Sequence, residues 1–364
     1  MTRIRDVVEI PYWKLRTGPK NSISDIEGIR VGHVTLIEGK GPLIPGRGPV
    51  RTGVTVVLPH DGNLYKEKVV ATAHVINGFT KAVGLIQVEE LGLIETPIAL
   101  TNTLNVGLVA DGLIELSVRS NPEIGVTAPT VNPLVLECND GYLNDIQGRH
   151  VKQYHVLEAV RKASTDFAEG AVGAGTGTVA FGFKGGIGTS SRIVTTSLGT
   201  YLVGVLVQTN FGKREDLTIG GVPVGKYLRG LEYGTFPGSV NVIVATDAPL
   251  TYRQLRRIAK RVQSGLARVG GYTYHGSGEV VVAFTTAYRI KHGVKELLDL
   301  KSLPDEELNE FFRGVIEATE EATLNSMFNS VTIEGRDGHV AYQIPVERVV
   351  ELIRDHHMRI STQK

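Results

Sequence analysis

The sequence contains very little cysteine and no long hydrophobic run. Cys138 is the only cysteine among 364 residues, which excludes an intrachain disulfide and is typical of a reducing compartment. No apolar run reaches the roughly 18 to 20 residues that cross a bilayer. The N-terminal stretch MTRIRDVVEIPYWKLR lacks the apolar region of a signal peptide. We expect a cytoplasmic protein that does not enter the membrane.

The sequence also lacks an excess of either charge. Lys and Arg total 39 against 38 for Asp and Glu, a formal net charge of +1. No basic arm or long block of like charges is present, so we expect no binding to nucleic acid or to anionic membranes. The expected partners are a small molecule and further copies of the chain.

Common cofactor and nucleophile motifs are missing as well. The ten histidines are scattered, and none lies in an H-E-x-x-H pattern, so we expect no metal and no other cofactor. The run Gly173-x-Gly175-x-Gly177 continues with Thr178, which breaks the dinucleotide fingerprint. Ser239 is not in a Gly-x-Ser-x-Gly context, which argues against a strand-to-helix nucleophile elbow.

Glycine, in contrast, is abundant, with 43 residues. The glycines recur between β-branched runs, as in GAVGAGTGTVAFGFKGGIG at 170–188. Glycine within strands marks bulges, tight bends or close approach of another backbone. This pattern predicts a strand-rich fold with a crowded site lined by backbone.

Apolar periodicity predicts an α/β architecture. Continuous apolar runs predict strands that are covered on both faces, at Val54–Pro59, Thr96–Asn102, Val203–Asn210, Ser239–Asp247 and Val280–Tyr288. Helical spacing and capping signals predict helices, at Val106–Val118, Tyr154–Lys162, Leu255–Val269 and Val346–His357, and one that begins near Ser302 and has Leu308 and Ile316 on its inward face. Without a linker or repeat, residues 1–364 are predicted to form one domain of sheets sandwiched by helices.

Two segments depart from this alternation. The Asp-Gly pair at Asp337 and Gly338 predicts a hairpin within VTIEGRDGHVAYQIP. The segment 212–238 is turn-rich and irregular, and it ends directly at a predicted strand. Long irregular loops inside compact domains tend to be functional, so this junction is a candidate site.

The junction reads Phe236-Pro237-Gly238-Ser239, and it could be an ordinary end of a loop. It could also carry chemistry, because Gly238 leaves its carbonyl open to attack by the Ser239 hydroxyl. An N-to-O acyl shift and hydrolysis would then free a serine that carries a nucleophile and an α-amine together. An unperturbed α-amine has a pKa near ~7.7, which suits a general base at neutral pH.

Three further segments could converge on Ser239. Ser277 and Glu279 alternate just before a predicted strand, so both point to one side and could form a hydroxyl–carboxylate relay that bonds Ser239, with His275 as a neighbour. Asn210 ends another strand, where its amide could stabilise an oxyanion. The polar stretch at 137–145 could bind substrate. Each segment alone also fits an ordinary turn or strand end.

Taken together, these segments resemble the DmpA-like family of L-aminopeptidase/D-amidase/D-esterase enzymes, which includes the β-peptidyl aminopeptidases. The resemblance spans nearly the whole chain. Its motifs, in order, are SISDIEGIRVGHVTL, VRTGVTVVLP, NTLNVG, ECNDGYLNDIQGRH, GAVGAGTGTVAFGFKGGIGTSSR, VLVQTNFG, GVPVG, PGSVNVIVATDAPL and GSGEVVVAFTTA.

The resemblance implies cleavage of the Gly238–Ser239 bond into an α fragment, 1–238, and a β fragment, 239–364. It implies that Ser239 is the nucleophile, and that Ser277, Glu279, Asn210 and Tyr142 complete the catalytic set. It implies substrates that are small peptides or amino acid amides and esters with a free amine. Glu137 or Asp140 is the expected anchor for that amine.

The resemblance also implies a four-layer αββα sandwich, like that of N-terminal-nucleophile hydrolases but with different strand connectivity, and a homo-oligomer, often a tetramer of αβ units. Two alternatives stay open. The first is an acyltransferase of the ornithine acetyltransferase type, which cleaves itself at a threonine. The second is a non-catalytic protein that keeps the fold.

Overall fold

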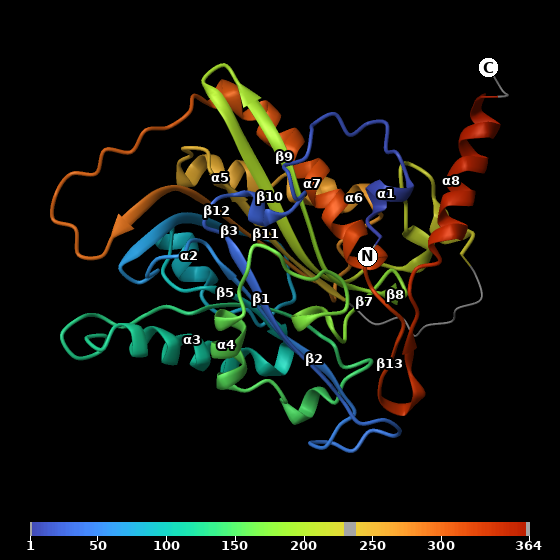
Figure 1. Cartoon of the computed structure of the whole chain (residues 1–364), viewed down its shortest axis with the longest axis horizontal. Helices are drawn as coiled ribbons and strands as arrows, with labels where there is room; N and C mark the ends of the chain where they lie inside the picture. Colours follow the sequence, from blue (N-terminus) through green and yellow to red (C-terminus); the bar gives the residue numbers. More distant parts are fainter. Residues whose placement is uncertain (1, 229–237, 362–364) are drawn as a thin grey trace.

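Two β-sheets lie at the centre of the chain in a computed structural model that describes residues 2–228 and 238–361 (Figure 1). The first sheet has the order β1-β2-β5-β6 and the second β4-β3-β12-β11-β10-β9. The strands of the first sheet are β1 (Arg30–Glu38), β2 (Val50–Leu58), β5 (Ile98–Asn102) and β6 (Leu134–Cys138). Those of the second are β3 (Glu67–Gly78), β4 (Leu93–Ile94), β9 (Gly186–Thr196), β10 (Gly199–Asn210), β11 (Ser239–Thr246) and β12 (Gly278–Lys291).

Helices cover the outer face of each sheet (Figure 1). On the first sheet lie α3 (Val106–Ser120) and α4 (Gln153–Arg161), and on the second α5 (Tyr252–Ala259), α6 (Val262–Arg268) and α7 (Leu308–Phe328). Short or peripheral elements complete the chain: α1 (Ile4–Val7), α2 (Leu85–Leu91), α8 (Val346–Ser361) and the two-stranded ribbons β7 (Val179–Ala180) with β8 (Phe183–Lys184) and β13 (Ile333–Glu334) with β14 (Val340–Ala341). This is the expected αββα sandwich.

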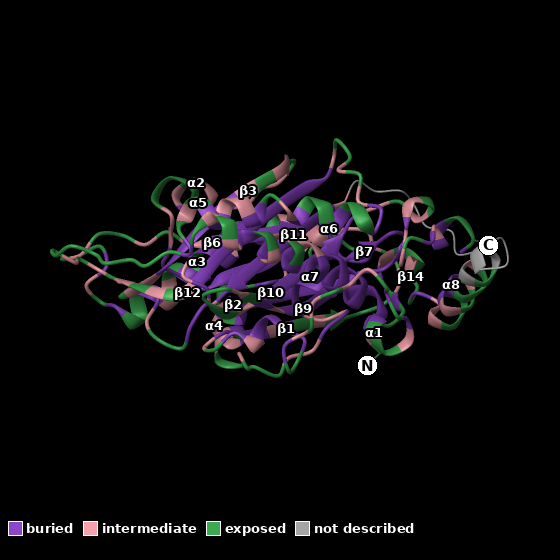
Figure 2. Cartoon of the chain, turned by 90° about the horizontal axis from the view of Figure 1, so that it is seen from above, coloured by how far each residue is buried: buried purple, intermediate pink, exposed green. Residues whose placement is uncertain are grey.

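The alternation of side chains along the central strands builds these layers. On β11, Val240, Val242 and Val244 join the core under α5, α6 and α7, whereas Ile243 and Ala245 join the core between the two sheets. Successive side chains of a strand point to opposite faces, so a strand in the middle of this fold must be apolar on both. Figure 2 shows this burial along the strands. The continuous apolar runs of the sequence were therefore a correct signal for strands covered on both faces.

The long helix predicted at Leu255–Val269 is wrong. The chain forms two helices there, α5 and α6, which meet at Lys260 and Arg261. Ala259 and Val262, on either side of the break, are both buried against the second sheet. The apolar spacing therefore continues across the break, which explains why it resembled one helix.

The cap predicted near Ser302 is also wrong. A short 3-10 turn at Asp305–Glu307 precedes α7, which begins only at Leu308. Ser302 Oγ donates to Gln254 Oε1 at 2.8 Å, and the Asp305 carboxylate pairs with Arg253 at 2.7 Å. Both polar side chains are thus used to attach this segment to α5.

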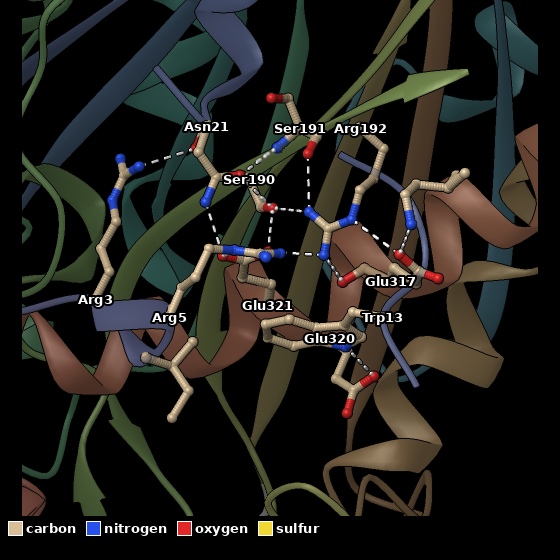
Figure 3. Close-up of polar contacts among 12 residues, drawn as sticks. Arg3, Arg5, Trp13, Asn21, Ser190, Ser191, Arg192, Glu317, Glu320 and Glu321 are labelled. Atoms are coloured by element: carbon tan, nitrogen blue, oxygen red, sulfur yellow. Dashed lines mark hydrogen bonds and ion pairs between the residues drawn. The ribbon is translucent and has the colours of Figure 1, made fainter. Parts of the chain in front are cut away.

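The middle of α7 buries acidic as well as apolar side chains, which the sequence did not predict. Glu317, Glu320 and Glu321 are all buried. Arg192 of β9, itself fully buried, pairs with Glu317 at 3.1 Å and with Glu321 at 2.7 Å. Figure 3 shows Arg5 reaching one of these carboxylates, that of Glu321, from the N-terminal segment, beside Trp13. Buried charges are tolerated only when they are paired in this way.

Residues 2–18 therefore act as a strap across α7. Ile4 N–H donates to Asn325 Oδ1 at 3.1 Å, and Trp13 Nε1 donates to Glu320 Oε2 at 2.9 Å. Further along, Lys14 N–H donates to Glu317 Oε1 at 2.9 Å. The N-terminal segment is thereby tied to the last part of the sandwich. No helix within residues 2–228 and 238–361 has the length and apolar character needed to cross a membrane.

Candidate active site

The ends of three neighbouring strands in the second sheet lie side by side and bring the predicted catalytic residues together. β10 and β11 are antiparallel with Asn210 opposite Ser239, and β12 runs parallel to β11 with Glu279 beside Val240. The end of β10 therefore lies next to the starts of β11 and β12. Residues that face each other across neighbouring strands have Cβ atoms about 5 Å apart. This register, rather than any local sequence motif, juxtaposes Asn210, Ser239 and Glu279.

Ser239 is buried at the first position of β11. Its Oγ accepts a hydrogen bond from the Gly278 N–H at 3.2 Å. Its carbonyl accepts from the thiol of Cys138, at the end of β6, at 3.4 Å. Burial raises the pKa of Cys138 well above its usual value, so the thiol stays neutral and can donate. The nucleophile candidate is thus held from both sheets.

Ser277 and Glu279 form the expected hydroxyl–carboxylate pair. Ser277 Oγ donates to Glu279 Oε1 at 2.8 Å, and Thr273 Oγ1 donates to Glu279 Oε2 at 2.8 Å. Burial raises the pKa of Glu279, whereas the two hydroxyl donors lower it because they stabilise the ionised form. The expected bond from Ser277 to the amine or the Oγ of Ser239 stays a prediction, since Ser277 Oγ donates to Glu279. In this structure, the bond to Ser239 Oγ comes from Gly278.

The loop that carries Ser277 is fixed by residues that the sequence did not indicate. Thr273 has a left-handed backbone with φ of +55°, which is rare for a β-branched residue. Asn77, near the end of β3, donates through Nδ2 to the carbonyls of Tyr274 at 3.1 Å, His275 at 3.2 Å and Ser277. His275 itself lies beside the ring of Phe79, with centroids 6.3 Å apart.

Asn210 is oriented by hydrogen bonds at both ends of its amide. Its Oδ1 accepts from the Val179 N–H at 2.9 Å, and its Nδ2 donates to the Asn139 carbonyl at 2.9 Å. An amide nitrogen has two hydrogens, so the bond to Asn139 uses one of them. The other is suited to an oxyanion in the pocket that Asn210 lines.

The glycine-rich stretch supports Asn210 from behind. The ammonium group of Lys184, fully buried, donates to the carbonyls of Gly175 at 2.8 Å, Thr178 at 2.7 Å and Gly185 at 2.8 Å. Burial lowers the pKa of Lys184, and the three carbonyls satisfy its three donors. Lys184 thus holds the β7–β8 ribbon, and with it Val179. It is a structural lysine.

A pocket of about 340 Å³ opens in front of Ser239. Its wall combines the ends of β6, β10 and β11 with nearby loops. Lining residues include Gly238, Ser239, Asn210, Glu137 and Tyr142, together with Phe79, Lys81, Thr103, Phe211 and Arg336. A concave site with a few convergent polar groups is the usual form of a small-molecule site.

The two candidate amine anchors differ in position. Glu137 lines the pocket, where its carboxylate accepts from the Lys81 N–H at 2.9 Å and from Thr80 Oγ1 at 3.1 Å, and also from the Thr103 hydroxyl. Asp140 lies beneath the surface, with Oδ1 bonded to Asn144 at 3.0 Å. Burial raises the pKa of Asp140 to about 7. Glu137 is therefore better placed to meet a substrate amine.

Tyr142 lines the same pocket and is stacked on His339, with ring centroids 4.5 Å apart and planes 5° from parallel. His339 Nδ1 also lies 2.8 Å from the Tyr142 carbonyl oxygen. The β13–β14 hairpin, predicted from its Asp-Gly turn, thus packs on the loop that carries Tyr142.

Part of the predicted junction lies outside the described residues. Phe236 and Pro237 belong to residues 229–237, whereas Gly238 and Ser239 are described. The earlier part of the predicted irregular segment contains two short 3-10 turns, at Arg214–Asp216 and Val224–Lys226. Within the described ranges, 2–228 and 238–361, the structure contains no group of three or more His, Cys, Asp or Glu side chains that could hold a metal ion.

The sandwich, with a buried serine at the start of a central strand and a pocket before it, defines a hydrolase of the N-terminal-nucleophile type. The chain belongs to peptidase family S58, whose sequence model matches residues 21–341. It is 40% identical over 354 residues to the β-peptidyl aminopeptidase BapA of Sphingosinicella xenopeptidilytica, covering 93% of this chain and 88% of that protein.

Solved structures agree with this assignment. The chain superposes on the L-aminopeptidase D-Ala-esterase/amidase of Ochrobactrum anthropi, described as a variant of the Ntn hydrolase fold, with a TM-score of 0.90 and 34% identity, covering 98% of this chain and 99% of that one. It superposes on the PH0078 protein of Pyrococcus horikoshii OT3 with a TM-score of 0.94 and 56% identity, again covering 98% and 99%. The family resemblance and the expected fold are thereby confirmed, and the chain is an aminopeptidase-family hydrolase.

Proposed function

We propose that this chain cleaves its own Gly238–Ser239 bond into fragments 1–238 and 239–364. The freed Ser239 is then the nucleophile of an aminopeptidase that acts on small peptides and on amino acid amides and esters. The observation that carries the proposal is the convergence on Ser239. Its Oγ accepts from Gly278, Asn210 lies opposite it on β10, and the Ser277–Glu279 pair begins the next strand.

Self-cleavage uses the hydroxyl of Ser239 against the carbonyl of Gly238. As the Oγ loses its proton, the Gly278 N–H stabilises the growing negative charge on that oxygen. Attack breaks the bond between the Gly238 carbonyl carbon and the Ser239 nitrogen, which takes up the proton given by Oγ, and leaves an ester between Gly238 and Ser239 Oγ. Water then hydrolyses the ester, which yields a Gly238 carboxylate and a free amine on Ser239.

Substrate hydrolysis repeats this chemistry on a second carbonyl. The Ser239 amine takes the proton from Oγ, and Oγ attacks the substrate carbonyl. The remaining N–H of Asn210 and the hydroxyl of Tyr142 face the resulting oxyanion. Ser277, oriented by Glu279, supports the amine while it returns the proton to the leaving group. Water then releases the acyl group and restores Ser239.

Glu137 is the proposed anchor for the substrate amine. It lines the pocket, and three donors hold its carboxylate in place without neutralising its charge. A fixed carboxylate favours a protonated amine, and this selects substrates with a free N-terminus. The similarity to β-peptidyl aminopeptidases makes β-amino acyl groups candidate substrates beside L-α and D residues.

The acyltransferase alternative is less well supported, because the junction carries serine rather than threonine and the chain matches an aminopeptidase family. We also propose a cytoplasmic homo-oligomer, a tetramer of αβ units. The single buried cysteine and the absence of disulfides fit a reducing compartment.

The purified protein tests this function directly. Denaturing electrophoresis and intact mass should show two fragments that together account for 39.4 kDa plus one water. The processed protein should hydrolyse an aminoacyl p-nitroanilide but not its N-acetylated form, because acetylation removes the charge that Glu137 recognises. A stable unbroken chain would contradict self-cleavage. Transfer of acetyl from N-acetylornithine to glutamate, without anilide hydrolysis, would favour the acyltransferase.

Thr273 offers a test of the Glu279 carboxylate through pH. Thr273→Val keeps the shape and the β-branch but removes a hydroxyl that lowers the pKa of Glu279. The pKa of Glu279 should then rise further, so activity on the acidic side should be lost at a higher pH. A charge-assisted hydrogen bond corresponds to a shift of about one pH unit. The measurement is kcat/KM against pH.

Thr273→Ser is the matched control for this experiment, because it restores the hydroxyl and should leave the acidic limb unchanged. If Thr273→Val lowers kcat/KM equally at every pH, the hydroxyl does not act through the Glu279 carboxylate.

A further inference from the structure

The pocket in front of Ser239 contains cationic side chains that the proposed mechanism does not use. Arg336 and Lys81 both line it, together with the acidic Glu137. An anchor for an amine explains Glu137 but gives no reason for a guanidinium in the same wall. A charged side chain in a substrate pocket is a specificity element when it is held in a fixed position.

Arg336 is held in such a position. It lies at the tip between β13 and β14, where its backbone N–H donates to the Leu143 carbonyl at 2.9 Å and its Nε donates to the Gly141 carbonyl at 2.8 Å. The hairpin backbone is pressed against this loop, since a Cβ at Gly335 would lie 2.2 Å from the Leu143 oxygen. The guanidinium therefore belongs to the Tyr142 side of the pocket.

Glu137 is held by different elements. Its donors are Thr80 and Lys81, which follow β3, and Thr103, which follows β5. One fixed anion and one fixed guanidinium thus belong to separate parts of the wall of a pocket of about 340 Å³. That volume is at the small end of the range for ligand pockets. The arrangement matches a short molecule with a positive charge at one end and a negative charge at the other.

We propose that Arg336 binds the C-terminal carboxylate of the substrate, so that the preferred substrates are free di- and tripeptides rather than peptide amides or longer chains. This inference rests on the proposed aminopeptidase function and identifies the part of the pocket that binds the leaving group. A guanidinium has five N–H donors in a planar fork that matches a carboxylate. The Nε bond to Gly141 uses one and the Nη1 bond to Asp337 uses another, which leaves one N–H on Nη1 and two on Nη2 for recognition.

Asp337 supports this assignment because it already presents a carboxylate to the same group. Arg336 Nη1 donates to Asp337 Oδ2 at 3.1 Å, and both side chains are partly exposed. The other oxygen of Asp337 accepts from the Leu43 N–H at 2.7 Å. Asp337 is therefore tethered beside the guanidinium, where it would compete with a substrate carboxylate.

The test compares two substrates that differ only in the terminal charge: an alanyl or β-alanyl dipeptide and its C-terminal amide. Wild type should favour the free acid in kcat/KM. Arg336→Gln should reduce kcat/KM for the free acid by about 10- to 100-fold, mainly through KM, and leave the amide nearly unchanged. Arg336→Lys keeps the charge but not the planar fork, so its kcat/KM for the free acid should lie between those of wild type and Arg336→Gln.

Asp337→Asn gives a second measurement that does not depend on losing an arginine. The amide oxygen can still accept from Leu43, whereas the competing charge is removed, so KM should fall for the free acid and stay constant for the amide. Equal losses on both substrates in Arg336→Gln would overturn the proposal and assign Arg336 a structural role on the Tyr142 loop. Loss of the free-acid preference in Lys81→Met, with the preference retained in Arg336→Gln, would overturn it in favour of Lys81.

The wild-type protein separates this inference from the function on which it rests. Cleavage of both substrates with equal kcat/KM would contradict only the role of Arg336. Cleavage of neither would contradict the aminopeptidase function itself.

Discussion

Ser239→Ala should leave the protein as a single chain of 39.4 kDa and abolish hydrolysis of aminoacyl anilides. The substitution removes the only atom proposed to attack either carbonyl. The Gly278 N–H that bonds this atom would lose its partner as well. Removal of a serine nucleophile typically lowers kcat by a factor of about 10⁶. Intact mass over several days and anilide hydrolysis measure the two effects.

Ser239→Thr is the informative variant beside it, because it keeps a hydroxyl and should retain some cleavage. Ser120→Ala, at the exposed end of α3, is the matched control and should be processed like wild type. Processing of Ser239→Ala at the same bond would show that another group attacks Gly238. The proposal for both reactions would then fail.

Gly238→Ala should slow self-cleavage strongly, for a steric reason. A Cβ at Gly238 would lie 1.7 Å from the Asn210 carbonyl oxygen and 2.7 Å from the Phe211 Cα. Both are backbone atoms of the neighbouring strand and its continuation, so they cannot move away cheaply. The added methyl must displace the scissile carbonyl from Ser239 Oγ. Overpacking of this kind costs about 1 to 3 kcal/mol, which corresponds to cleavage that is slower by about 5- to 150-fold.

The time course of the two fragments on a denaturing gel measures this rate. Gly107→Ala is the control, because a Cβ there meets nothing within 4 Å and processing should be unchanged. Any Gly238→Ala protein that does cleave should regain normal activity, since residue 238 is no longer bonded to the nucleophile. Cleavage at the wild-type rate would contradict the close approach to Asn210.

Local features of the sequence predicted a large part of this site. The alternation of Ser277 and Glu279 before an apolar run correctly indicated that the two side chains meet, at 2.8 Å. The continuous apolar runs located β10, β11 and β12 because burial on both faces leaves a strong local signature. Local sequence did not predict that Asn210 lies opposite Ser239, because the register between two strands depends on both strands at once.

The features that were missed are those with no local signature. Thr273 reaches Glu279 from a left-handed backbone, which is unusual for its residue type, and the hydroxyls of Thr80 and Thr103 that hold the predicted anchor Glu137 come from two distant loops. The buried acids of α7 were missed for the same reason. Glu317 and Glu321 are compensated by Arg192 and Arg5, more than a hundred residues away in the chain. Charged residues predict a solvated helix face unless such partners are known.

The strand order of the second sheet has a consequence for the timing of maturation. β11 and β12 lie between β3 and β10, so the segment after Ser239 is flanked on both sides by strands that precede it. The strap at residues 2–18 likewise precedes Ser239 in the chain and binds α7, which follows it. Ser239 meets Asn210 only once these distant parts have assembled. Only folded molecules would therefore be cleaved. The two fragments would stay associated, because strands of one fragment lie between strands of the other in the same sheet.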